Sequence, residues 1–109
     1  MTKKIIGYTT GVFDLFHIGH LNILEKASKK CDFLIVGVTD SKTVLKYKGR
    51  LPIVSLKDRM SIVKAIKFVD KVVVQKKMDK IEAWNKYKFN IIFHGDDWKN
   101  SPMYNEIEK

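Results

Sequence analysis

The segment that most constrains the fold is GVFDLFHIGH at residues 11–20. An apolar run over residues 5–9 precedes it and predicts a buried strand. Apolar residues at helical spacing over 21–30 follow it and predict a helix. The chain is therefore expected to begin with a strand–loop–helix unit whose loop carries most of this segment.

Two histidines, His17 and His20, stand three residues apart where the predicted helix begins. That spacing places both imidazoles on one face of the first helical turn. The same turn has backbone N–H groups without helical partners and the positive end of the helix dipole, which both favour an anion. Gly19, between the histidines, is expected to leave room for a ligand that approaches the backbone. These features together predict a site for a phosphate or polyphosphate.

Strand and helix patterns alternate along the rest of the chain. Continuous apolar runs predict strands over 33–38, 72–74 and 91–93. This alternation predicts an α/β fold with a Rossmann-like, doubly wound parallel sheet and right-handed crossovers. The segments predicted between and after the strands are a short helix over 42–46, an exposed basic loop over 46–52, a helix capped by Ser55 that continues to Val69, a helix capped by Asp79 that continues through Tyr87, and a last helix that begins at Ser101 and Pro102.

Two polar segments follow strands at the same edge of this predicted sheet. Residues 11–20 follow the first strand, and residues 95–98, with the sequence GDDW, follow the fourth. In open parallel sheets, ligands bind outside the carboxyl ends of the strands, where the strand order reverses. We therefore expect both segments to lie around one ligand.

The charge of the chain indicates an anionic partner. The 109 residues fit a single domain, 1–109, and carry a formal charge of +9 from 21 basic and 12 acidic residues. Nucleic acid is one such partner, but no ladder of stacking aromatics, zinc-ligand spacing or helix-turn-helix pattern accompanies the charge. A basic nucleotide cleft with a lysine-rich surface explains the charge more simply, so nucleic acid is the weaker interpretation.

Cellular location is constrained by what the sequence lacks. There is no apolar run near the roughly 18 residues that a membrane span needs, and no signal peptide. The single cysteine, Cys31, excludes an internal disulfide and fits a reducing compartment. We expect a cytoplasmic protein without a membrane partner, with Cys31 packed at a helix end rather than acting as a nucleophile.

Several of these segments also resemble a known family. The histidine stretch resembles the His-x-Gly-His signature of the nucleotidyltransferase superfamily, whose HIGH spelling is shared with class I aminoacyl-tRNA synthetases. Residues 94–98, HGDDW, resemble the Gly-Asp-Asp-Trp segment of the glycerol-3-phosphate cytidylyltransferases. Lys46, Lys48 and the pair at 58–59 fit the order of that family. The resemblance spans nearly the whole chain, and it is specific because the HIGH motif is combined with the preceding Gly-x-Phe-Asp and the later Gly-Asp-Asp-Trp.

The resemblance implies a cytidylyltransferase that transfers CMP from CTP to a small phosphorylated alcohol such as glycerol 3-phosphate. The products would be a CDP-alcohol and pyrophosphate, with Mg²⁺ carried by the CTP, and the enzyme would be a homodimer. Such a reaction needs no general base, because a phosphate monoester with a second pKa near 6 is already ionised at neutral pH. The site must instead supply in-line positioning and positive charge around the phosphorus.

The resemblance also implies a role for each matching residue. A guanidinium suits a bidentate grip on phosphate, although an ordinary ion pair on the helix surface is the alternative for Arg59. For Asp14 three roles stay open, which are orienting a histidine, holding magnesium and capping the helix. The implied set is His17, His20, Lys46 and Arg59 for catalysis, Lys48 for the phosphate of the acceptor, and Thr10, Gly11, Val12, Phe13, Asp14, Gly19, Gly95, Asp96, Asp97 and Trp98 for the nucleotide.

Two alternatives accompany this interpretation. One is an adenylyltransferase of the same fold, of the pantetheine-phosphate or FAD-forming type. The other is a non-catalytic fragment that binds nucleotide, because members of the resembled family continue into a fifth strand and an Arg-Thr-x-Gly-Ile-Ser-Thr-Thr segment that has no match in these 109 residues. We accordingly expect a domain truncated at its C-terminus, whose activity by itself is reduced.

Overall fold

Four parallel strands form one sheet in the computed structural model, which describes residues 4–76 and 80–93. The strand order is β3-β2-β1-β4, so the sheet is the Rossmann-like parallel α/β arrangement that the sequence predicted. No helix within the described ranges is long and apolar enough to cross a membrane. In chain order the elements are β1 (Ile6–Gly11), α1 (Ile18–Ser28), β2 (Phe33–Thr39), α2 (Ser41–Lys48), α3 (Leu56–Lys64), β3 (Lys71–Gln75), α4 (Lys80–Tyr87) and β4 (Ile91–Phe93).

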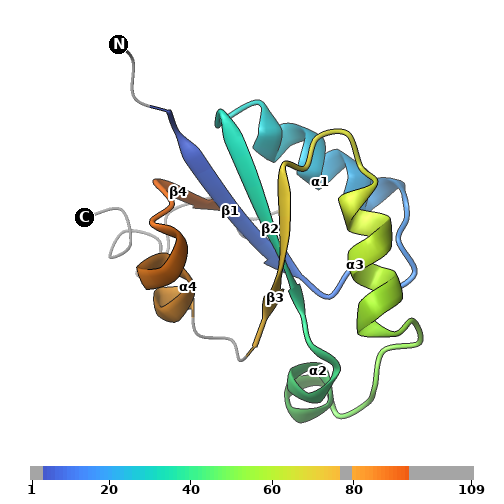
Figure 1. The fold of residues 1–109 in the computed structure, drawn as a ribbon. Coiled ribbons are helices and arrows are strands. Elements are labelled where there is room, and N and C mark those ends of the chain that lie inside the picture. The colour runs from blue at the N-terminus through green and yellow to red at the C-terminus, as the bar shows by residue number, and fades with distance from the viewer. Residues whose placement is uncertain (1–3, 77–79, 94–109) are drawn as a thin grey trace.

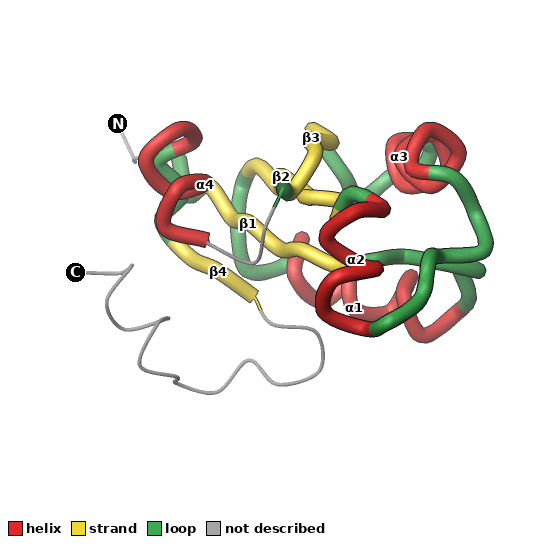
Figure 2. Tube along the Cα trace, turned by 90° about the horizontal axis from the view of Figure 1, so that it is seen from below, coloured by secondary structure: helices red, strands yellow, loops and turns green. Residues whose placement is uncertain are grey.

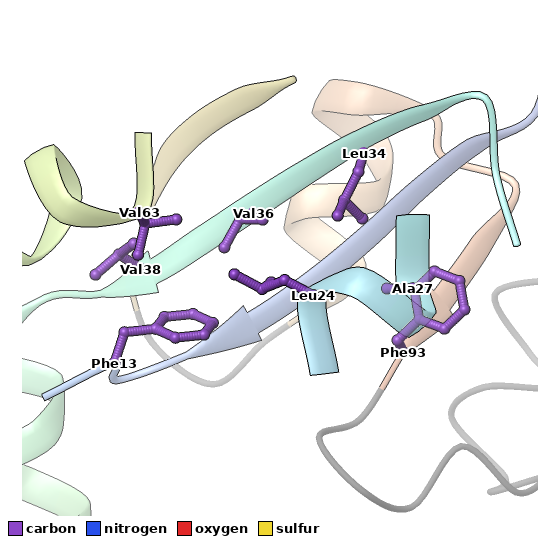
Figure 3. Close-up of a cluster of buried hydrophobic side chains, with 8 residues drawn as sticks. All are labelled: Phe13, Leu24, Ala27, Leu34, Val36, Val38, Val63 and Phe93. Carbon is purple, nitrogen blue, oxygen red and sulfur yellow. The ribbon is translucent and has the colours of Figure 1, made fainter. Parts of the chain in front are cut away.

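Helices cover both faces of the sheet. Helices α1 and α3 lie against one face and α4 lies against the other (Figures 1 and 2). Each face has its own apolar core. The core under α1 and α3 consists of the side chains drawn in Figure 3, which are Phe13, Leu24, Ala27, Leu34, Val36, Val38, Val63 and Phe93. The core under α4 consists of Tyr8, Ile35, Val73, Phe89 and Ile92, with Trp84 and Tyr87 packed against it.

Strand β2 illustrates why a continuous apolar run predicted a strand covered on both faces. Alternate residues of a strand point to opposite faces of the sheet. Leu34 and Val36 pack into the core under α1 and α3, whereas Ile35 between them packs into the core under α4. Because β2 pairs with β1 on one side and with β3 on the other, its backbone is paired on both edges as well. The prediction for this strand is therefore confirmed.

Two predicted helix boundaries were wrong. Helix α2 continues to Lys48 and ends at Gly49, whose φ of 76° places it in the left-handed region that terminates helices. The predicted basic loop over 46–52 therefore begins later, at Gly49. Helix α3 ends at Lys64, before the predicted end at Val69, because the chain must turn to enter β3. The apolar side chains that suggested a longer helix, Ile66 and Val69, still pack against the core from this turn.

The strand order reverses at β1. The chain runs from β1 to β2 and β3 on one side of the sheet, and β4 pairs with β1 on the other side. Helix α2 lies beyond the carboxyl end of β2, at the bottom of Figure 1. The loop after β1 is thus at the switch point, where open parallel sheets bind ligands.

Candidate active site

The loop that follows β1 has an unusual backbone. Phe13 and Leu15 have φ values of 54° and 51°, in the left-handed region that non-glycine residues rarely adopt. The Phe13 ring is buried and lies 5.5 Å from the His20 ring and 6.2 Å from the Phe16 ring, between centroids. This packing anchors a conformation that costs about 1–3 kcal/mol per residue and is common at ligand-binding sites.

The two histidines cap helix α1. His17 is the N-cap, and its Nδ1 accepts a hydrogen bond of 3.0 Å from the backbone N–H of Gly19. In return, Nδ1 of His20 accepts a hydrogen bond of 3.1 Å from the backbone N–H of His17. The ring centroids are 4.1 Å apart, so the prediction that both imidazoles share one face of the first turn is confirmed.

This capping fixes the tautomer of both rings. A backbone N–H can only donate, so each Nδ1 that accepts from one must be unprotonated. A neutral imidazole then carries its proton on Nε2, which makes Nε2 a hydrogen-bond donor. The cap also uses two backbone N–H groups that the sequence suggested were free for an anion. The donors that the turn offers therefore include Nε2–H groups, in addition to any remaining amides.

The structure gives Gly19 a different role from the predicted one. A Cβ atom at this position would lie 2.7 Å from Cε1 and 3.0 Å from Nδ1 of His17. The missing side chain thus makes room for the capping imidazole, in place of the ligand that we had expected there.

Burial favours the uncharged form of His20. Its pKa is lowered from the ordinary value of 6.5, chiefly by burial and secondarily by the nearby His17. His20 is accordingly neutral at pH 7, and a neutral ring keeps the Nδ1 lone pair that the cap requires.

An open cleft of about 480 Å³ lies at the carboxyl end of β1, and His20 lines it whereas His17 is not among its lining residues. It brings together seven of the residues that the sequence predicted, namely Thr10, Gly11, Val12, Phe13, Asp14, His20 and Lys48. Its remaining lining residues are Thr9, Leu15, Ile23, Val44, Arg50, Leu51, Pro52 and Ile53. Lys48 and Arg50 supply two cations. The sequence interpretation missed Arg50, although its place in the basic run 46–50 was a usable signal.

Lys46 is not among the residues that line the cleft. Residues two positions apart on a helix point in different directions. Because α2 extends through both lysines, Lys46 and Lys48 cannot both face the cleft as they could from the predicted loop. Lys46 is exposed, and its ammonium lies 5.7 Å from the centroid of the Tyr47 ring.

Asp14 has a role that none of the three open alternatives covered. Its two carboxylate oxygens accept hydrogen bonds of 2.8 Å from the backbone N–H of Ile53 and 2.9 Å from that of Val54. These two bonds, in that order, are the main causes that lower the pKa of Asp14 from its usual 3.8. Asp14 therefore ties the loop after β1 to the segment that precedes α3.

Arg59 is buried, and its guanidinium donates only to protein oxygens among the described contacts. Its side chain is wholly inaccessible to solvent, and its partners are the carbonyl oxygens of Val12, Thr39 and Val54 and the hydroxyl of Ser41. The bidentate grip on phosphate that the sequence suggested does not fit this geometry, and neither does an ion pair on the helix surface.

The remaining predicted site residues, Gly95, Asp96, Asp97 and Trp98, lie outside the described residues, as do the predicted cap Asp79 and the predicted last helix. Within the described ranges, no group of three or more histidine, cysteine, aspartate or glutamate side chains could hold a metal ion.

Comparisons with known proteins agree with this fold. A family model described as cytidylyltransferase-like matches residues 8–109. A crystal structure of a lipopolysaccharide core biosynthesis protein from Thermoplasma volcanium has a TM-score of 0.83 and 27% identity, over 96% of this chain and 87% of that one.

Three curated relatives are similar in sequence. An FAD synthase from Thermococcus sibiricus is 47% identical over 72 residues, which cover 66% of this chain and 49% of that protein. An FAD synthase from Pyrococcus abyssi is 41% identical, over 87% of this chain and 65% of that protein. An ethanolamine-phosphate cytidylyltransferase from Dictyostelium discoideum is 40% identical, over 86% of this chain and 26% of that protein. The chain thus spans between about a quarter and two thirds of the length of these relatives.

Proposed function

Because the chain belongs to the cytidylyltransferase-like family, we propose that it transfers a nucleoside monophosphate from a nucleoside triphosphate to a phosphate monoester. The observation that carries this proposal is the reciprocal cap of α1, which leaves Nε2 of His17 and of His20 as donors. His20 lines a cleft that also contains the cations Lys48 and Arg50. Neutral hydrogen-bond donors beside two cations suit the binding of a polyphosphate. These same groups would not act as a nucleophile or as a strong base.

The proposed reaction is an in-line displacement at the α-phosphorus. An ionised oxygen of the phosphate monoester forms a new bond to the α-phosphorus, and the bond from the α-phosphorus to the bridging oxygen of the β-phosphate breaks. Pyrophosphate leaves with the electron pair of that bond, and no proton has to move. The Nε2–H groups and the cations stabilise the negative charge that builds on the oxygens around the phosphorus, where one such donor is typically worth about 3 kcal/mol.

Magnesium enters this proposal with the nucleotide. Both oxygens of Asp14 already accept backbone hydrogen bonds, and the described residues contain no cluster of metal ligands. A Mg²⁺ ion bound to the triphosphate would offset part of its charge. The residues of the chain would then bind and orient the phosphates.

Two nucleotides are candidates, and each has specific support. CTP, with a small phosphorylated alcohol as acceptor, is supported by the resemblance of residues 95–98 to the Gly-Asp-Asp-Trp segment and by the ethanolamine-phosphate cytidylyltransferase relative. ATP, with a flavin phosphate as acceptor, is supported by the two FAD synthase relatives at 47% and 41% identity. We place CTP first because the resemblance to the cytidine-specific family extends to the segment that would contact the base.

A matrix of substrates tests the proposal. The chain would be incubated with Mg²⁺, with CTP or ATP, and with glycerol 3-phosphate, ethanolamine phosphate or FMN, and pyrophosphate release would be measured. We expect release that needs both a nucleotide and an acceptor, that is fastest with CTP and an alcohol phosphate, and that falls about 10²-fold in His20→Ala.

The outcomes separate the candidates. Release with ATP and FMN alone would replace the first candidate by the second. Absence of release with every pair, from a folded chain, would contradict the proposed activity for these 109 residues.

A further inference from the structure

The buried guanidinium of Arg59 joins three segments of the chain, around residues 12, 39–41 and 54. Its Nε donates to the carbonyl of Val54 at 2.9 Å. One terminal nitrogen, Nη1, donates to the carbonyls of Val12 at 2.9 Å and Thr39 at 2.6 Å. The other, Nη2, donates to Oγ of Ser41 at 3.1 Å. Within the described structure, four of the five N–H groups of this guanidinium are therefore already used.

These three segments contain or adjoin residues that line the cleft. Val12 belongs to the loop after β1 and itself lines the cleft. Thr39 ends β2 and Ser41 begins α2, the helix that presents Lys48. Val54 follows the segment 50–53, which also lines the cleft and contains Arg50.

Asp14 also links the loop after β1 to the segment that precedes α3, with its side chain coming from the loop. Arg59 reaches from α3 to the loop after β1, whereas the Asp14 carboxylate reaches from that loop to the backbone N–H groups of Ile53 and Val54. Val54 thus takes part in both links, through its carbonyl to Arg59 and through its N–H to Asp14. The loop after β1 and the segment that contains Arg50 are therefore linked through both backbone groups of Val54. Its N–H donates to Asp14, and its carbonyl accepts from Arg59, which also donates to Val12.

The chemistry of the guanidinium explains why this position needs arginine. The N–H groups of arginine point in several fixed directions in one plane, whereas the ammonium of lysine is a compact point charge with three donors. Burial lowers the pKa of Arg59, against the opposing effect of the carboxylates of Asp14 and Asp40. The hydrogen bonds of this buried cation go to three backbone carbonyls and one hydroxyl among the described contacts, so replacing arginine would leave these oxygens without their donor.

We propose that Arg59 is a positioning residue, which sets the distance between the histidine turn of α1 and the cations Lys48 and Arg50 without touching the substrate. This inference rests on the proposed nucleotidyl transfer. A reaction that depends on in-line alignment loses about 10²-fold in rate when its groups shift by roughly 1 Å. The role of Arg59 is thereby distinct from the phosphate contact that its charge suggests.

The test compares Arg59→Lys with Arg59→Gln, and uses Lys64→Gln as the matched control. Lys64 lies on the same helix, is exposed, and loses the same single charge. Two quantities would be measured on folded protein, which are kcat and KM for the nucleotide, and the hydrogen-exchange rates of the Ile53 and Val54 amides. Arg59→Lys keeps the positive charge but loses the planar set of N–H donors that reaches several carbonyls at once. We expect kcat to fall about 10²-fold in both Arg59 variants, exchange at both amides to rise about tenfold or more, and no change in Lys64→Gln.

Three outcomes would overturn the proposal. If Arg59→Lys retains most of the turnover while Arg59→Gln loses it, the charge acts on the phosphates directly. If both variants lose only thermal stability, with kcat of the folded protein unchanged, the role is structural alone. If exchange at Ile53 and Val54 is unchanged, Arg59 does not hold this segment.

Ser41→Ala keeps the proposal testable if both Arg59 variants fail to fold. It removes the hydrogen bond from Nη2 of Arg59 to the Ser41 hydroxyl. We expect the exchange rates of the Ile53 and Val54 amides to rise, by less than in the Arg59 variants. The exchange measurement also needs no substrate, so it tests the position of the segment even if no nucleotide and acceptor pair supports turnover in the unchanged chain.

Discussion

At the scale of single residues, His17 and His20 each perform two tasks with one ring. Nδ1 accepts a backbone hydrogen bond that starts helix α1, and this leaves Nε2 as a donor. The proposed catalytic form of each histidine is therefore also the form that the helix cap requires. Protonation of Nδ1 would remove both the acceptor and the cap.

This coupling makes a pH prediction for His20. Its folded pKa lies below the ordinary 6.5, so the unfolded chain takes up the proton first as the pH falls. The stability that neutral His20 contributes is complete above about pH 6.5 and is lost as the pH falls from there through the folded pKa. We expect Tm to fall more between pH 8 and pH 5 in the unchanged chain than in His20→Asn, which keeps an acceptor but does not titrate.

The same ring can be examined by NMR. Nitrogen chemical shifts at pH 8 are expected to show an unprotonated Nδ1 and a protonated Nε2 for both histidines. A Nδ1–H tautomer at either ring, or an equal pH dependence of Tm in the two proteins, would contradict the reciprocal cap.

At the scale of the elements, the first turn of α1 depends on a glycine that would ordinarily weaken a helix. Replacement of a helical glycine by alanine usually stabilises by about 1 kcal/mol. At Gly19 the new Cβ would lie 2.7 Å from the His17 ring, which must move and thereby leave its cap. The local geometry here opposes the intrinsic helix propensity.

We therefore expect Gly19→Ala to give no gain in stability and to lower turnover, because the displaced His17 no longer accepts from the backbone. Thermal unfolding and kcat would be measured beside Asn22→Ala, an exposed position in the same helix. That control is expected to gain a few tenths of a kcal/mol from propensity alone. A gain near 1 kcal/mol in Gly19→Ala with full turnover would show that His17 does not need this space.

Helix α2 shows how an element boundary decides which residues reach the site. Asp40 caps its first turn, with Oδ1 accepting from the N–H of Thr43 at 3.2 Å, and Gly49 ends it. Between these two signals the chain is helical throughout, so Lys48 lines the cleft and Lys46 does not. The caps thus determine which lysine can meet a phosphate.

At the scale of the whole molecule, the side chains on the face of the sheet that α4 covers are closely packed over the central strands β1 and β2. The hydroxyl of Tyr8 on β1 donates to Oε1 of Gln75 on β3 and passes over Gly37 on β2. Burial raises the pKa of Tyr8, so it stays a protonated donor at all ordinary pH values. The absence of a side chain at Gly37 is what permits this crossing.

Gly37→Ala tests this packing. The added Cβ would overlap the Tyr8 hydroxyl and lie 2.9 Å from Cζ of that ring. Such overpacking in the centre of a sheet costs about 1–3 kcal/mol. We expect that loss in urea unfolding, and we expect Tyr8→Phe to recover part of it in the double variant, because the overlapping oxygen is gone. Strictly additive effects of the two substitutions would show that the contact does not limit the packing.

The alternation of strands and helices, the start of α1 at the histidines and the cap of α3 at Ser55 were predictable from the order of residues alone. In the structure, Oγ of Ser55 accepts from the N–H of Asp58. These features depend on spacing and on hydrogen bonds between residues within about four positions, which the order of residues specifies directly.

The roles of Arg59 and Asp14, in contrast, depend on contacts between residues that are distant in the sequence. The guanidinium of Arg59 meets the carbonyl of Val12 across 47 positions, and the Asp14 carboxylate meets the N–H of Val54 across 40. These two hydrogen bonds depend on the order of the strands in the sheet and on the turns that follow β1 and β2. A basic and an acidic side chain look like surface charges in the sequence, and it is the convergence of several distant backbone groups that makes them internal partners.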